Sequence, residues 1–415
     1  MVDSIKTVCM LIYNYYPLPT GGAERQCRLQ AKELVRSGCR CFVVTAKVGN
    51  DLPGREIDQG CEIIRVPIVQ PVIDRLISIK NTFSKEKNCS QESMSQVKTG
   101  IDVKAGAQVG ILAIVVQWMN TLCFIVTSGW FIYRNRSEID VIHTHVASWN
   151  AGFAGWIGNM LNIPVVCKAA YLPPFDQLLT TVPFSSFWSK WRKKTNYIAL
   201  VPEMAQALYD EGVDEANVTI LPNGVLIPSE RAPVEDNRTV LYVGNFSQGS
   251  GHKGFDTLLK SWAIVSKNVA DAHLVLAGGG DLGKWKSLAE NLQCINTVSF
   301  LGHVADLGRV YMDAGIFILP SRGEGMSNAL LEAHSYGIPA VVSDIPGNRE
   351  IVQDGETGYI VPVDAHDEYA SAVIALLRDP SLRYNFGINA RERTINKYSI
   401  ERVVEEVRKT YLTLC

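Results

Sequence analysis

The sequence predicts an α/β protein with two successive parallel-sheet domains. Residues 7–221 alternate short apolar runs, typical of buried strands, with helical stretches, and the same alternation restarts at residue 239. Strands that alternate with helices form parallel sheets whose faces are covered by those helices. Residues 223–237 carry two prolines and several charges, as a linker between domains does. We therefore expect an N-terminal domain over 1–224 and a C-terminal domain over 225–395.

Each strand expected in the first half is a short run rich in apolar residues. A helix is predicted over 24–37, because apolar residues recur there at helical spacing and Gly38 follows, as glycine commonly does after a helix. The expected strands are 7–13, 41–46, 62–66, 141–145, 165–168, 198–201 and 218–221.

The second half repeats the pattern with shorter connections. The expected helices are 255–266, 282–291 and 327–336, and the last of these ends at a Gly-Ile-Pro sequence. The expected strands are 239–243, 273–277, 298–300, 316–319, 340–343 and 359–361.

Composition excludes two classes of protein. Of the 415 residues, 47% are hydrophobic and 20% are charged, which is enough apolar material for two cores and argues against disorder. The net charge of −2 is far from the strongly basic character of a dedicated nucleic-acid binder, so we expect no nucleic-acid partner. The first residues show no signal-peptide pattern and the ten cysteines form no CxxC pair, so we expect a cytoplasmic location.

Two stretches interrupt the alternation in the first half. Residues 84–106 are polar and without periodicity, which predicts a long loop. Residues 109–133 contain no charged residue and are long enough to cross a bilayer. We favour a buried or groove-lining helix there, because a membrane span would separate two parts of one sheet domain. Insertion into a membrane surface or an acceptor-lipid groove, and a transmembrane helix, are the alternatives.

Residues 184–194 interleave aromatic and basic side chains. Aromatic rings favour the headgroup level of a membrane, and basic groups are attracted to anionic lipids. Membrane contact and an ordinary solvated helix with one apolar face therefore both stay open. The residues concerned are Phe184, Phe187, Trp188, Lys190, Trp191, Arg192, Lys193 and Lys194.

The segment 319–333 carries the strongest chemical signal. Glu324 lies in a glycine-flanked loop at the end of an expected strand, and Glu332 lies eight positions later in the following helix. Ligands of open parallel sheets bind beyond the carboxyl ends of the strands. The unpaired amides at the start of that helix form an anion site, and a buried Glu332 needs hydrogen-bond donors such as those of a ribose diol.

This segment resembles the E-x7-E motif of family-four retaining glycosyltransferases (glycosyl transferases group one). Their GT-B fold has two Rossmann-like domains that face each other across a cleft. Other segments match the family in the same order, beginning with a glycine-rich first loop. They are residues 14–25, 221–225, 242–244 with 252–256, 275–281, 300–304, and 349–352 with 354–358.

The resemblance implies roles for the donor-site residues. Glu324 would accept hydrogen bonds from the donor sugar and balance positive charge at the anomeric carbon. Glu332 would bind the ribose diol, and Lys253 would hold the diphosphate and neutralise the leaving group. Other substrate-binding positions are Met326, Ser327 and Asn328 at the helix start, with Gly278 and Val304 in the matching segments after two strands.

The resemblance also assigns residues of the first domain. Gly21 and Gly22 would let the backbone approach the donor phosphate and the acceptor. His145 corresponds to the family's histidine near the transferred sugar. We expect His143 to point to the opposite face and to be structural. The last helix, about 396–415, is implied to return to the N-terminal domain.

The donor site departs from the family pattern at Asn245, among other positions. Asn245 stands where the family usually places an arginine, and asparagine cannot supply that charge to the diphosphate. Arg322 is a candidate substitute, and a structural, ion-paired arginine is the alternative.

The sequence therefore predicts a retaining, metal-independent glycosyltransferase. It would move a sugar from a nucleotide-diphosphate sugar to a glycan or lipid-linked acceptor, in cell-surface polysaccharide or glycolipid assembly. We expect no cofactor beyond this co-substrate, and peripheral contact with the inner face of the membrane through 109–133 and 184–194. The alternatives are a non-catalytic nucleotide-sugar-binding protein, which Asn245 would suit, and a nucleotide-sugar epimerase of the same fold.

Overall fold

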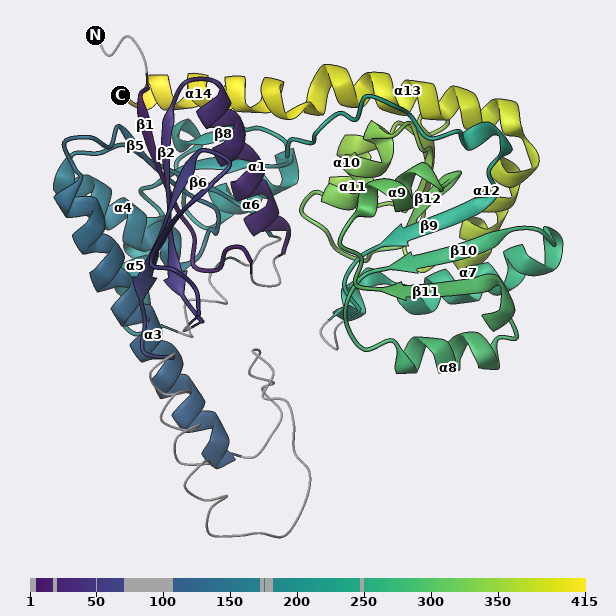
Figure 1. Cartoon of the computed structure of the whole chain (residues 1–415), viewed down its shortest axis with the longest axis horizontal. Helices are drawn as coiled ribbons and strands as arrows, with labels where there is room; N and C mark the ends of the chain where they lie inside the picture. Colours follow the sequence, from purple (N-terminus) through teal and green to yellow (C-terminus); the bar gives the residue numbers. More distant parts are fainter. Residues whose placement is uncertain are drawn as a thin grey trace.

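The chain forms two Rossmann-like domains, each built on one sheet (Figure 1). The computed structural model describes residues 5–17, 21–49, 51–70, 107–171, 175, 182–246 and 250–415, with side chains of the helix at 107–134 from residue 114 on. The loop predicted at 84–106 lies outside the described residues.

The first sheet has eight strands in the order β3-β4-β2-β1-β5-β6-β7-β8. All neighbouring strands are parallel except β3, which runs antiparallel to β4 at the edge. The strands are β1 Thr7–Leu11, β2 Arg40–Lys47, β3 Arg55–Asp58, β4 Cys61–Pro67, β5 Val141–Thr144, β6 Val165–Lys168, β7 Asn196–Ala199 and β8 Val218–Ile220.

The second sheet has six parallel strands in the order β11-β10-β9-β12-β13-β14. Four of the predicted strands have the bounds that the sequence indicates, because each is an uninterrupted apolar run ended by polar or glycine residues. The strands are β9 Thr239–Val243, β10 His273–Ala277, β11 Val298–Gly302, β12 Ile316–Leu319, β13 Ala340–Ser343 and β14 Gly358–Val361.

Helices cover both faces of each sheet. In the first domain they are α1 Gly22–Arg36, α3 Ala107–Arg134, α4 Trp149–Leu161, α5 Ser185–Arg192 and α6 Pro202–Asp210. Those that follow are α7 Phe255–Asn268, α8 Gly283–Asn291, α9 Leu307–Met312, α10 Asn328–Ser335, α11 Pro346–Ile351, α12 His366–Arg378, α13 Pro380–Tyr398 and α14 Ile400–Leu414. Short 3₁₀ helices are η2 Glu215–Asn217, η3 Val234–Asp236, η4 Ser250–Lys253 and η5 Ile295–Thr297.

The alternation of side chains along β1 explains the two cores of the first domain. Cys9 and Leu11 pack in the cluster formed with α3, α4 and α5, whereas Val8 and Met10 pack in the cluster formed with α1 and α14. Successive residues of a strand point to opposite faces, so the uninterrupted apolar run supplies both cores.

The last two helices run along both domains at the top of Figure 1. Apolar residues of α14, such as Val403 and Val407, are buried against the first domain. The linker is tied to the junction of α13 and α14, because Val225 N donates to Tyr398 O at 2.8 Å and Ile400 N donates to Val225 O at 2.9 Å. The last helix, α14, therefore packs on the domain in which the chain begins.

Each sheet has a point where the strand order reverses direction. In the first sheet the order runs outward from β1 to β2 on one side, and then resumes at β5 on the other side. In the second sheet the reversal lies between β9 and β12. Adjacent loops leave such a point in opposite directions and form a crevice in which ligands of α/β sheets bind.

Helix α3 differs from the favoured interpretation of residues 109–133. Phe124, Phe131 and Ile132 are buried against the domain, but Trp118 and Val126 are exposed on the other side. The interpretation as a buried helix is therefore wrong for the outer side of α3. From residue 114 to residue 134 it is long and apolar enough to cross a membrane by length and composition.

Helix α5 covers most of the aromatic and basic stretch at 184–194. Trp188 is buried among the aromatic residues of α4, and Arg192 is buried and ion-paired with Glu211. Phe184 and Phe187 remain exposed. The stretch is thus a helix with one apolar face packed inward and further aromatic residues facing outward.

Candidate active site

A lysine–glutamate ion pair lies at the reversal point of the second sheet. Lys253 ends η4, which follows β9, and Glu324 lies in the loop that follows β12. Lys253 Nζ donates a hydrogen bond to Glu324 Oε1, and Ser321 Oγ donates to the same oxygen at 3.0 Å. Both charged side chains are largely shielded from solvent, which strengthens their attraction relative to an exposed pair.

A glycine allows the two loops that carry this pair to touch. Gly254 has a φ of +67°, and a Cβ atom there would lie 1.9 Å from the carbonyl oxygen of Pro320. Arg322 N also donates to His252 O at 2.6 Å. Any side chain at position 254 would push the loops apart, so this glycine fixes Lys253 next to Glu324.

Helix α10 begins beside this pair and presents its first amides. Ser327 caps the helix, because its hydroxyl oxygen accepts a hydrogen bond from Leu330 N at 3.3 Å. The first amides of a helix lack partners within it and carry the positive end of the helix dipole. The start of α10 can therefore hold an anion close to Lys253.

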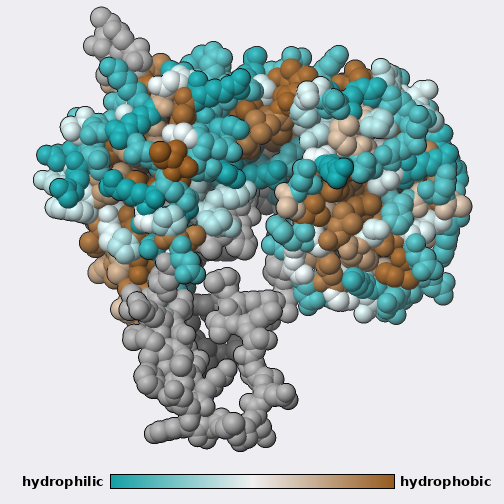
Figure 2. Space-filling model, in the orientation of Figure 1, coloured by the Kyte–Doolittle hydropathy of each residue, from teal (hydrophilic) through white to brown (hydrophobic). Residues whose placement is uncertain are grey.

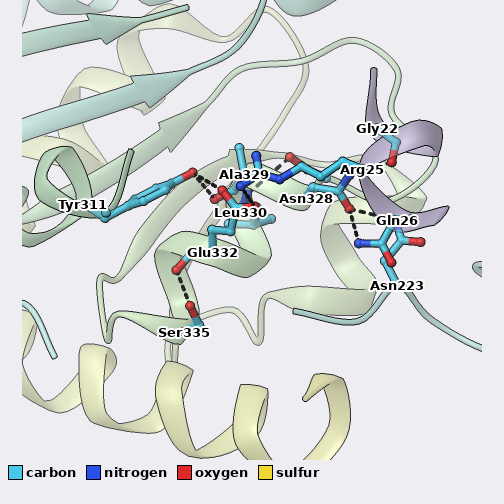
Figure 3. Close-up of polar contacts among 12 residues, drawn as sticks. Gly22, Arg25, Gln26, Asn223, Tyr311, Asn328, Ala329, Leu330, Glu332 and Ser335 are labelled. Carbon is cyan, nitrogen blue, oxygen red and sulfur yellow. Dashed lines mark hydrogen bonds and ion pairs between the residues drawn. The ribbon is translucent and has the colours of Figure 1, made fainter. Parts of the chain in front are cut away.

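Glu332, one turn further along α10, is bound from both domains (Figure 3). Tyr311 Oη donates to Glu332 Oε2 at 2.9 Å, and Arg25 of α1 forms an ion pair with Glu332 Oε1 at 2.6 Å. Burial raises the pKa of the Glu332 carboxyl, while Arg25 and the hydrogen bond from Tyr311 oppose this rise. The carboxylate is thus partnered by donors, as a buried one must be.

Asn328 joins the two domains beside that ion pair, as Figure 3 shows. Its Oδ1 accepts from Gln26 Nε2 at 2.9 Å and from Asn223 Nδ2 at 3.1 Å, and its Nδ2 donates to Gly22 O at 3.2 Å. A Cβ atom on Gly22 would lie 3.1 Å from Asn328 Nδ2, so glycine permits this close approach. The glycine-rich loop and the start of α10 therefore meet across the two domains.

The reversal point of the first sheet carries a histidine pair. The rings of His143 and His145 stack with centroids 4.6 Å apart, and His143 Nδ1 shares a hydrogen bond with the Tyr411 hydroxyl. The expectation that the two histidines point to opposite faces is therefore wrong, because residues two apart in a strand share a face. His143 is held by α14, as a structural residue would be.

His145 and Lys168 are fully buried beside each other at the ends of β5 and β6. Within the described residues, the two ring nitrogens of His145 have no hydrogen-bond partner, and neither does the Nζ of Lys168. Burial, together with the neighbouring His143 and Lys168, lowers the pKa of His145 well below its ordinary value. Burial also lowers the pKa of Lys168 to about 7. His145 is therefore neutral at physiological pH and can accept or donate one hydrogen bond.

Residues 227–393 match the model of the family described as glycosyl transferases group 1. This part of the chain is a glycosyl transferases group 1 domain. The match lies in the domain that carries Lys253, Glu324 and Glu332, so the group 1 domain contains the ion pair and the α10 site described above.

Curated relatives of moderate identity are glycosyltransferases by name. An uncharacterized glycosyltransferase of Haemophilus influenzae is 28% identical over 50% of this chain and 59% of its own length. The match thus spans less than two thirds of that relative. A phosphatidyl-myo-inositol mannosyltransferase of Mycobacterium leprae is 28% identical over 67% of this chain and 74% of its own length.

The fold is that of solved GT-B glycosyltransferases. A mutant of TarM from S. aureus, in complex with Fondaparinux, alpha-GlcNAc-glycerol and UDP, aligns with a TM-score of 0.71 at 16% identity. The alignment covers 98% of this chain and 100% of that chain. The predicted fold class, two Rossmann-like domains of the GT-B type, is confirmed.

The group 1 domain holds Arg322 in a position that favours its structural interpretation. Its NH2 group lies 2.9 Å from Asp256 and 2.7 Å from Asp364, and its NH1 group donates to Gly251 O at 2.7 Å. The hydrogen bonds that Arg322 donates to Asp364 and Asp256 raise the pKa of its guanidinium. Because the guanidinium is bound by these carboxylates and by Gly251 O, it holds the loop that carries Glu324 in place.

Asn245 and Gly278 occupy adjoining loops at the ends of β9 and β10 in the group 1 domain. Gly278 has a φ of +151°, and a Cβ atom there would lie 1.7 Å from Gly244 O. Phe246 N donates a hydrogen bond to Gly279 O at 2.8 Å. Val304 follows β11 and packs against the core of the same domain. All three predicted positions therefore lie at one edge of this sheet.

Four residues of the site have no role in the sequence prediction. Arg25 ends the glycine-rich segment 14–25 and Gln26 follows it directly, and the sequence there does not reveal the partners of either side chain. Tyr311 carries no motif signal. Lys168 ends a buried apolar strand, and an ionisable residue in such a run is the signal that could have found it.

Metal binding is not supported by a cluster of ligands. In the part of the chain that the structure describes, no three His, Cys, Asp or Glu side chains are grouped so as to hold a metal ion. Metal independence stays a prediction.

The Glu332→Ala variant is expected to bind nucleoside diphosphate about 10-fold to 100-fold more weakly. A ribose diol would donate two hydrogen bonds to this carboxylate, at about 1.5–3 kcal/mol each, but it would have to displace Arg25 and Tyr311, which offsets part of that gain. Titration calorimetry of both proteins measures the difference. Glu392→Ala, which removes an exposed glutamate of α13, is the matched control. Unchanged affinity in Glu332→Ala would contradict the ribose assignment.

The Lys168→Met variant is expected to be more stable than the parent at neutral pH. The folded pKa of Lys168 is about 7, whereas the unfolded lysine keeps its ordinary value of 10.5. A pKa lowered on folding means that the folded state resists protonation of Lys168. The contribution of Lys168 to the free energy of unfolding of the parent therefore falls as the pH drops from 10.5 to 7 and is constant below pH 7. The gain should be about 2–4 kcal/mol below pH 7 and vanish near pH 10.5.

Thermal unfolding of the parent and of Lys168→Met across this pH range tests the expectation. Lys260→Met, at an exposed position of α7, should show no such pH-dependent gain. A gain of the same size at every pH would point to packing alone.

Proposed function

We propose that the chain is a retaining, metal-independent glycosyltransferase. It transfers a sugar from a nucleotide-diphosphate sugar to a glycan or lipid-linked acceptor in the assembly of a cell-surface polysaccharide or glycolipid. The observation that carries the proposal is the Lys253–Glu324 pair at the reversal point of the second sheet, beside the start of α10. The mannosyltransferase relative and the TarM complex with UDP support a nucleotide-sugar donor and a lipid or glycan acceptor.

The arrangement of charges suits the breaking of a glycosidic bond to a diphosphate. When the donor binds, Lys253 exchanges Glu324 for the diphosphate, and the α10 amides bind the same negative charge. Glu324 then accepts hydrogen bonds from the sugar hydroxyls and balances the positive charge that develops at the anomeric carbon. The two partners of the resting ion pair thus stabilise the two opposite charges of one transition state.

Retention of configuration follows from a same-face displacement. The bond between the anomeric carbon and the diphosphate oxygen breaks, and its electron pair leaves with the diphosphate. The acceptor hydroxyl forms the new bond on the same face and gives its proton to the leaving phosphate oxygen. This route uses no carboxylate nucleophile of the protein.

Glu332 and the first domain position the two substrates. The ribose diol of the donor replaces Arg25 and Tyr311 as hydrogen-bond donor to Glu332, so nucleotide binding opens a contact between the domains. The backbone of Gly22 contacts Asn328 of α10, and Gly21 and Gly22 border the donor phosphate. His145, neutral and buried, lies on the acceptor side.

We further propose a cytoplasmic location, with peripheral contact at the inner face of the membrane through residues 109–133 and 184–194. A lipid-linked acceptor is held at that surface, so contact there would bring the acceptor to the first domain.

A donor panel tests the proposal. The full chain is incubated with UDP-, GDP- and ADP-sugars and a membrane extract, with and without EDTA, and nucleoside diphosphate release is measured. One donor is expected to release diphosphate with EDTA present, and NMR of the product gives the anomeric configuration. Tight nucleotide binding without release from any donor would overturn the enzyme assignment and favour a nucleotide-sugar-binding protein. Release that needs an added metal would overturn metal independence.

A further inference from the structure

The outer side of α3 is apolar along its described length. Trp118, Val126 and Trp130 are exposed by 38%, 68% and 59%, respectively. They belong to a stripe that recurs at helical spacing, and none of its members is charged. The stripe consists of Val115, Trp118, Met119, Leu122, Val126, Trp130 and Tyr133.

The inner side of α3 carries the polar residues of this helix. Asn120, Thr121 and Ser128 are buried, and Asn120 Oδ1 accepts a hydrogen bond from Gln70 N at 2.7 Å. Ser128 Oγ donates to Phe124 O within the helix. A helix on the surface of a protein in water exposes its polar residues, whereas α3 buries these polar residues together with Phe124 and Ile132 and exposes apolar ones. The outer stripe of α3 is therefore suited to apolar surroundings.

The neighbouring helices add positive charge without negative charge. None of α3, α4 and α5 contains an aspartate or a glutamate. Arg134 lies over the Trp130 ring at 5.7 Å from its centroid, and Arg136 lies over Tyr133 at 4.4 Å. Lys193 and Lys194 follow α5, which packs on α4.

Helices α3, α4 and α5 form one side of the first domain, and α3 extends beyond the sheet (Figure 1). Figure 2 shows hydrophobic residues on this left side of the molecule. Exposed apolar residues of the neighbours, Met160 of α4 and Phe187 of α5, belong to the same three helices. We call this surface, formed by the α3 stripe with Met160, Phe184 and Phe187, the α3–α5 face.

We propose that the α3–α5 face docks the chain on an anionic lipid bilayer, with α3 lying in the membrane surface and not crossing it. From Asn120 on, the inner side of α3 is occupied by its own domain through Phe124, Phe131 and Ile132, so lipid can reach only the outer side there. Aromatic rings with adjoining cations match the interfacial region. Pairing with a second copy would bring together surfaces that carry positive charges and no carboxylates on these helices, so charge favours an anionic surface.

The inference deepens the proposed function and rests on it for its purpose. A chain docked in this way holds its first domain, which carries His145 and the glycine-rich loop, at the surface where lipid-linked acceptors reside.

Flotation of the full chain with vesicles tests the docking. The chain is expected to float with vesicles of phosphatidylcholine and phosphatidylglycerol, and more weakly with phosphatidylcholine alone or at high salt. The double variant Trp118→Ser with Trp130→Ser should bind at least about tenfold more weakly, since burial of an aromatic side chain in the interface is lost. Lys193→Ala with Lys194→Ala should reduce the salt dependence. Quenching of tryptophan fluorescence by lipids brominated at shallow positions, more than at deep ones, is expected of an in-plane helix.

Matched controls separate docking from folding and from catalysis. Ile395→Ser with Leu412→Ser removes equally exposed apolar residues from α13 and α14 and should leave flotation unchanged. The tryptophan variant should keep its circular dichroism and its release of nucleoside diphosphate in detergent. Equal flotation of the parent and the tryptophan variant would overturn the inference. It would also be overturned if the parent were a dimer, the tryptophan variant were a monomer, and neither protein floated. Diphosphate release without flotation would leave the enzyme proposal standing and refute the docking alone.

Discussion

The Glu324→Gln variant is expected to lose sugar transfer by about 10²–10³-fold and to bind nucleoside diphosphate within about threefold of the parent. The substitution keeps the size and the hydrogen-bonding oxygen of the side chain but removes its charge. The lost charge stabilises positive character that exists only in the transition state, so turnover falls while ground-state binding is retained. Diphosphate release and titration calorimetry on the same preparations measure the two effects.

The resting ion pair makes this expectation sharper. In Glu324→Gln the Lys253 ammonium loses the carboxylate that holds it, so the diphosphate no longer competes with Glu324 for Lys253. Nucleotide affinity should therefore stay equal or rise slightly. Glu356→Gln, at an exposed position of the same domain, should change neither quantity. A large fall in nucleotide affinity with unchanged turnover at saturation would place Glu324 in ground-state binding and contradict its role at the anomeric carbon.

The sequence predicts those parts of the fold that depend on local pattern. Strands such as 239–243 and 316–319 are recovered because a short apolar run ended by glycine or proline indicates a buried parallel strand. Strand β3 is missed because Arg55–Asp58 is a short, exposed edge strand with three charged residues, and only its pairing with β4 makes it a strand.

Contacts between distant segments lie beyond such a pattern. Arg25 and Glu332 are both visible in recognised motifs, but their ion pair depends on how the two domains meet. The composition of α3 likewise does not say which side of the helix packs. The buried side, which mixes polar and apolar residues, and the exposed apolar side become apparent only when the helix is placed on its sheet.

The Lys253→Met variant is expected to lower transfer by about 10²–10³-fold and to weaken nucleoside diphosphate binding about tenfold or more. The lysine neutralises the diphosphate both when bound and, more strongly, as it leaves. Binding of the nucleoside without phosphates should be unchanged, because the ribose is assigned to the Glu332 carboxylate and not to Lys253. Calorimetry with the diphosphate and with the nucleoside separates these contributions, and equal losses for both ligands would contradict a diphosphate role.

A double-mutant cycle distinguishes the loss of a ligand group from the loss of a structural ion pair. Lys253→Met leaves the shielded Glu324 carboxylate with Ser321 as its remaining donor among the described side chains, and an uncompensated charge of this kind costs about 1–3 kcal/mol of stability. Adding Glu324→Gln removes that charge, so the double variant should regain most of the stability that Lys253→Met loses. It should regain none of the transfer, because the two side chains stabilise opposite charges in the reaction. Recovery of transfer together with stability would mean that Lys253 acts only by holding Glu324 in place.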